Sequence, residues 1–92
     1  MKYIDKLKRV KDANVNVIKL FIAHEVDSLL KEQISVITEE VFEEICTLVY
    51  ENYLKIYYSS IEDVAKIVCK LYLEGKSIQE KIIRTTLETE SF

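Results

Sequence analysis

Four closely spaced glutamates are the first residues in this sequence whose type and spacing could do chemistry. They form two pairs, each four residues apart: Glu39 with Glu43, and Glu40 with Glu44. A helix would place each pair on one face, where two carboxylates can hold a hard cation. No Glu-x-x-His follows, as it does in di-iron bundles, and acidic residues also stabilise the first turn of a helix. The pattern therefore favours an electrostatic role over a metal site.

Candidate nucleophiles and soft metal ligands are few. His24 is the single histidine, and Cys46 and Cys69 are the only cysteines and form no Cys-x-x-Cys motif. This set lacks the usual ligands for zinc or redox chemistry, so we expect both cysteines to be small buried hydrophobes and His24 a partly exposed helix residue. No acid, base and nucleophile come together, so we expect no enzyme, no metal and no cofactor.

The composition indicates one mainly α-helical domain. The chain has 92 residues, of which 49% are hydrophobic and 32% charged, with one glycine and no proline. A chain of this length forms one domain, and so few turn residues exclude a loop-rich β-sandwich or a glycine-rich phosphate loop. No apolar run has the length of a signal peptide or a membrane span, and two unpaired cysteines favour a reducing compartment. We expect residues 1–92 to form a single cytoplasmic domain with no membrane partner.

Charge is unevenly distributed along the chain. Residues 1–20 have a net charge of +4, residues 21–64 of −8 and residues 65–92 of +1. These charges are either solvated helix faces or fields that attract partners of opposite sign. In the second case the acidic middle predicts a protein partner with a basic surface, and the two ends are the better place for nucleic acid.

Apolar spacing predicts a small bundle of four to five short helices. Thr38 has the chemistry of an N-cap, and Ile37 and Phe42 have the spacing of a hydrophobic staple across it. Residues 1–12 read as a basic N-terminal helix, 13–52 as an acidic helical part and 53–92 as a strand or helix followed by a helical hairpin. The predicted helices cover residues 2–12, 15–33, 38–52, 60–74 and 77–90.

Serines and the single glycine predict the ends of the last two helices. Ser59 and Ser60 mark the start of the fourth predicted helix, and Ser59 with Glu62, like Ser77 with Glu80, has capping-box spacing. Gly75 lies where a helix would end in a left-handed residue.

Two segments suit more than one structure. Residues 15–23 are rich in β-branched side chains, which suit a strand as well as the helix predicted there. Residues 53–58 (YLKIYY) are rich in aromatic ones. The second segment either extends the helix at 38–52 to residue 58 or forms one short strand at 54–58.

The strand alternative comes with a family resemblance. Gly75 and Ser77 form a Gly-x-Ser at the start of the last predicted helix, followed by Ile83, Arg84 and Leu87. With the strand-like run and the helix before them, residues 53–87 resemble the ribbon-helix-helix family of dimeric DNA-binding proteins.

That resemblance implies a mode of DNA binding. Strands from two chains would pair antiparallel and enter the major groove. Lys55 and Tyr57 would face the bases, and Lys76 and Ser77 would contact phosphate at a helix N-terminus. Leu54, Ile56 and Tyr58 would face the core.

Two functions are therefore expected, both of them non-enzymatic and regulatory. The first is a dimeric DNA-binding transcriptional regulator. The alternative is an acidic helical adaptor or inhibitor, antitoxin-like or encoded by a mobile element, that docks on a basic protein surface. The partner-binding residues would then be Glu39, Glu40, Glu43 and Glu44.

The aromatic content also predicts a homodimer. Six tyrosines and three phenylalanines are more aromatic surface than a small bundle needs to bury. Three residues would lie outside the main apolar stripe of a helix that continued to residue 58 and are the expected dimer interface: Tyr50, Leu54 and Tyr58.

Overall fold

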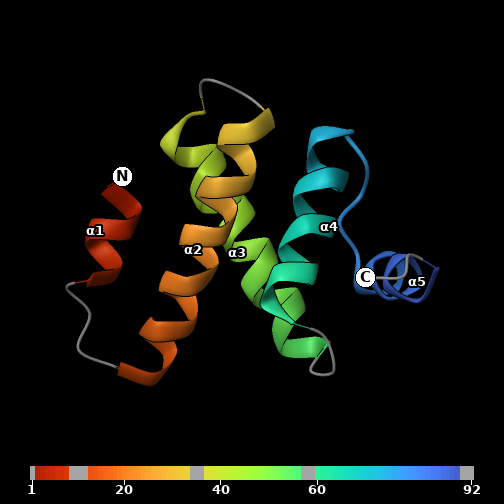
Figure 1. Cartoon of the computed structure of the whole chain (residues 1–92), viewed down its shortest axis with the longest axis horizontal. Helices are drawn as coiled ribbons and strands as arrows, with labels where there is room; N and C mark the ends of the chain where they lie inside the picture. The colour runs from red at the N-terminus through yellow and green to blue at the C-terminus, as the bar shows by residue number, and fades with distance from the viewer. Residues whose placement is uncertain (1, 9–12, 34–36, 57–59, 90–92) are drawn as a thin grey trace.

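The chain forms a bundle of five helices in a computed structural model that describes residues 2–8, 13–33, 37–56 and 60–89. The helices are α1 (Lys2–Lys8), α2 (Ala13–Gln33), α3 (Glu39–Lys55), α4 (Ile61–Leu73) and α5 (Glu80–Thr89). Figure 1 shows α1 at one end of the molecule, α5 at the other, and α2, α3 and α4 between them. The described part of the chain contains no strand. The mainly α-helical bundle predicted from the apolar spacing is confirmed.

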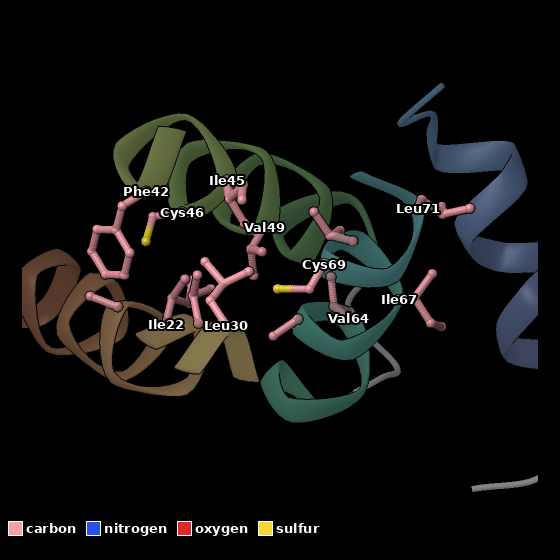
Figure 2. Packing of buried hydrophobic residues seen from close by; sticks show 14 of the residues in the cluster. Ile22, Leu30, Phe42, Ile45, Cys46, Val49, Val64, Ile67, Cys69 and Leu71 are labelled. Atoms are coloured by element: carbon pink, nitrogen blue, oxygen red, sulfur yellow. The ribbon is translucent and has the colours of Figure 1, made fainter. Parts of the chain in front are cut away.

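Helices α2, α3 and α4 enclose the core. Leu30 of α2, Val49 of α3 and Val64 of α4 are almost fully buried, and each of these helices packs on the other two (Figure 2). Helix α1 covers one side of α2 and α3, where the ring of Tyr3 meets that of Phe42 edge-on with a centroid distance of 6.1 Å. Cys46 and Cys69 lie in the same core, as their sequence context predicts.

Side-chain hydroxyl groups cap the N-termini of α3 and α4. The Thr38 hydroxyl accepts a hydrogen bond from the Val41 amide at 3.2 Å, so the predicted cap of α3 is confirmed. The cap of α4 is Ser60, whose hydroxyl accepts from the Asp63 amide at 3.2 Å. The sequence offers both Ser59 and Ser60 at this start, and the cap at Ser60 is confirmed; Ser59, which has the capping-box spacing to Glu62, lies outside the described residues.

The start of α5 also differs from the prediction. The helix begins at Glu80, and its first backbone hydrogen bond joins the Ile83 amide to the Gln79 carbonyl at 3.0 Å. Ser77 is exposed in the connection before it, so Ser77 is not the cap. The position of α5 is fixed by the burial of Ile83 rather than by a serine.

Gly75 ends α4 as predicted. Its φ of +72° is left-handed, its amide bonds the Tyr72 carbonyl at 3.0 Å, and the Lys76 amide bonds the Leu71 carbonyl at 2.9 Å. This is the Schellman arrangement, which satisfies carbonyls that lack a partner within the helix.

The alternative strand at residues 54–58 is wrong where the structure describes it. Leu54 and Lys55 are the last residues of α3, and Leu54 is exposed rather than facing the core. Ile56 is fully buried, which anchors the end of α3 in the bundle, and its amide bonds the Asn52 carbonyl at 2.9 Å and so completes the last helical turn. Tyr57 and Tyr58 lie outside the described residues.

Among the described helices, none has the length and apolarity needed to cross a membrane.

Replacing Gly75 tests the end of α4. A Cβ at this position would meet nothing within 4 Å, so only the left-handed backbone resists a side chain. We expect Gly75→Ala to lower the free energy of unfolding by about 1–2 kcal/mol and Gly75→Asn by less, because Asn tolerates this conformation. Urea denaturation measures both values. An alanine variant as stable as the parent protein would contradict the assignment.

Thiol reactivity tests the core. Burial raises the pKa of Cys46 and of Cys69 to about 12, so neither thiol forms the reactive thiolate near neutral pH. We expect Ellman's reagent to leave the folded protein unmodified and to modify both cysteines once urea unfolds it. The variant Thr47→Cys, at an exposed position, is the control and should react at once. Rapid modification of the folded parent protein would show that the core is open.

Candidate functional site

The outward side of α3 carries exposed acidic side chains on successive turns. Phe42, Ile45 and Val49 face the core, and the opposite side of the helix faces solvent. Its exposed residues, here called the α3 face, are Glu40, Glu43, Glu44, Thr47, Glu51, Leu54 and, at the last position of the helix, Lys55.

The negative charge of the α3 face is directed to solvent. Within the described residues, none of its glutamates forms an ion pair with a basic side chain. The ion pairs that the structure shows lie on other elements: Lys31 with Asp27, Lys76 with Glu74, and Arg84 with Glu80. The Glu44 carboxylate accepts a hydrogen bond from an uncharged group, the Tyr72 hydroxyl, at 3.0 Å. The face can therefore attract a positively charged surface.

The structure places three of the four predicted partner-binding glutamates together. Glu40, Glu43 and Glu44 are exposed on the α3 face, whereas Glu39 is half-buried at its flank. The Oε2 atom of Glu39 is buried and has no hydrogen-bond partner among the described residues. The prediction missed Glu51, which helical periodicity from Glu44 would have found.

An apolar residue lies at the end of the acidic face. Leu54 is 56% exposed, which is unusual for a large aliphatic side chain in a small protein. Tyr50, one turn earlier, is half-buried, and the ammonium of Lys19 lies 5.0 Å from the centroid of its ring. Nothing local in the sequence predicts this contact between α2 and α3.

The predicted DNA-binding residues lie on separate elements. Lys55 ends α3, and Lys76 and Ser77 lie in the connection between α4 and α5. Lys76 forms an ion pair with Glu74 at 2.9 Å, and Ser77 precedes the first turn of α5 rather than capping it. Tyr57 lies outside the described residues. A helix N-terminus that presents Ser77 to a phosphate is therefore not present at this position.

Metal ligands do not gather in the described part of the chain. No group of three His, Cys, Asp or Glu side chains there is arranged to hold an ion. His24 is exposed on α2.

Comparison with models of protein families, with curated proteins and with solved structures gives no match for this chain.

Titration of Tyr72 tests the geometry of the α3 face. The hydrogen bond to Glu44 is the main cause that raises the pKa of Tyr72 above its ordinary value of 10.0. We expect Glu44→Gln to lower this pKa, because the charge that favours the protonated phenol is removed, while Glu43→Gln leaves it unchanged. NMR titration of the Tyr72 ring carbon measures the change. Equal values in the parent protein and in Glu44→Gln would contradict the contact between α3 and α4.

Proposed function

We propose that this chain is a cytoplasmic, non-enzymatic regulatory protein that acts by binding another protein. The α3 face would be the binding surface, and a basic surface its complement. The observation that carries the proposal is the excess of negative charge on the α3 face: Glu40, Glu43 and Glu51 form no ion pair in the described chain, and Lys55 is the one basic residue of α3.

Charge and one exposed apolar side chain would together form the binding surface. Exposed charges of one sign steer a complementary surface into place and select against partners of the same sign. Charge alone gives little affinity at the surface, because solvent screens each pair. Leu54 would supply the apolar anchor at one end of the face, since its side chain is exposed and loses water contact when covered.

DNA binding by a dimeric transcriptional regulator stays a prediction from the sequence. A ribbon requires extended chains that pair through their backbones, whereas Leu54 and Lys55 have their backbones in α3. The acidic face would also repel phosphate. The geometry therefore favours the protein-binding alternative. Self-association through Tyr50 and Leu54 is compatible with either function and stays a prediction as well.

A charge-reversal pair with a matched control tests the proposal. A photo-crosslinking amino acid at Thr47, in the middle of the α3 face, would capture the partner in the cells that make this protein. We expect Glu40→Lys with Glu51→Lys to weaken binding to the captured protein by about tenfold or more at ~0.1 M salt. Asp5→Lys with Glu88→Lys changes the net charge by the same amount at exposed positions on α1 and α5 and should have little effect.

Two results would contradict the proposal. One is an equal loss of binding in both double variants, which would mean that net charge alone matters. The other is no discrete protein product at Thr47 together with nucleic-acid crosslinks from a probe at Lys76, which would favour DNA binding.

A further inference from the structure

Helix α5 joins the bundle through a narrow contact. It lies beyond α4 at the end of the molecule and packs mainly on that helix (Figure 1). Ile83 is its one fully buried side chain, whereas Ile82 and Leu87 of α5, and Ile78 in the connection before it, are only half-buried against the core. Each of α2, α3 and α4, in contrast, buries several side chains completely. The described part of α5 is therefore held by much less apolar burial than the rest of the bundle.

The side of α4 that faces α5 is itself apolar. Figure 2 shows Ile67 and Leu71 on this side, away from the core formed with α2 and α3. They are 2% and 6% exposed with α5 in place. If α5 moved away, two large aliphatic side chains of α4 would lose their cover.

One polar contact ties α5 to the end of α3. Arg84 donates from Nη2 to the Lys55 carbonyl at 2.9 Å, and from Nε and Nη2 to Glu80 Oε1 at 3.0 and 2.8 Å. Lys55 is the last residue of α3, where carbonyls have no partner within the helix. Arg84 supplies such a partner from α5, so the end of α3 and the docking of α5 depend on each other.

Helix α5 has little stability of its own. It has ten residues, whereas isolated helices shorter than about 12–15 residues are marginal in water. Once undocked, α5 would lose its helical hydrogen bonds together with its contacts, so docking and helix formation are one cooperative event. The non-helical connection of residues 76–79 between α4 and α5 leaves room for this movement.

We propose that α5 is a strap that opens as a unit while α2, α4 and all but the last turn of α3 stay folded. Opening uncovers the apolar side of α4 at Ile67 and Leu71 and releases the last carbonyl of α3. This device operates in the free protein and does not depend on the proposed function. It would make the last turn of α3, with Leu54, less ordered whenever the strap is open.

Hydrogen exchange of the full chain, read by mass spectrometry, tests the strap. We expect amides of α5 to exchange at least about tenfold faster than those of α2 and α4. Ile83→Ala should accelerate α5 by a further factor of about ten or more and leave α2 and α4 protected. Arg84→Met, which keeps an unbranched side chain but removes the guanidinium, should accelerate α5 and the last turn of α3 together. Lys81→Met, at an exposed position of α5, is the control and should change neither.

Equal exchange of α5 and α4 in the parent protein would overturn the proposal, because it would mean that the bundle opens only as a whole. Acceleration of α5 without the end of α3 in Arg84→Met would overturn the coupling through Lys55. If Ile83→Ala fails to fold, the parent protein and the Arg84→Met and Lys81→Met pair still decide both points.

Discussion

Burial of α4 on several sides at once is the constraint on which the rest of the structure depends. Val64 and Cys69 lie toward α2 and α3, and Ile67 and Leu71 lie toward α5. At about 100° per residue, the arc from Ile67 to Cys69 spans roughly 200° of the helix surface. A single neighbouring helix cannot cover such an arc. The fold therefore needs α2 and α3 on one side of α4 and α5 on the other, and the exposed stripe that remains carries Lys66 and Lys70.

Helix α3 shows how the same packing creates a surface for binding. Its apolar stripe packs against α2, α4 and α1, and four of its glutamates face outward: Glu40, Glu43, Glu44 and Glu51. Asn52, the one buried polar residue among those described, is accommodated because its side-chain amide donates to the Leu48 carbonyl at 2.8 Å. The α3 face is thus a consequence of core packing together with the choice of glutamate at the outward positions.

Local chemistry made much of this fold predictable from the sequence. Thr38 and Gly75 act through hydrogen bonds within a few residues, so their roles follow from residue type and spacing. Ser77 and Glu80 have capping-box spacing, so the sequence predicts a helix start at Ser77. That prediction is wrong because the start of α5 depends on the burial of Ile83 against α4, which local spacing does not reveal. Residues 54–56 were ambiguous because their side chains suit helix and strand alike. The burial of Ile56 and the bond from Arg84 to Lys55 resolve that ambiguity, and both involve contacts distant in sequence. The contact between the Lys19 ammonium and the Tyr50 ring also joins residues that are distant in sequence.

Binding through the α3 face requires that α3 stays helical to Lys55 and so presents its glutamates and Leu54 to a protein partner. The direct test is NMR in solution, with carbon secondary shifts and amide contacts read at Leu54, Lys55 and Ile56. We expect helical shifts at Leu54 and Lys55, their loss at Ile56, and no backbone contacts between chains in this segment. Extended shifts at Leu54 and Lys55 with amide contacts between two chains would contradict this expectation and would indicate a DNA-binding ribbon.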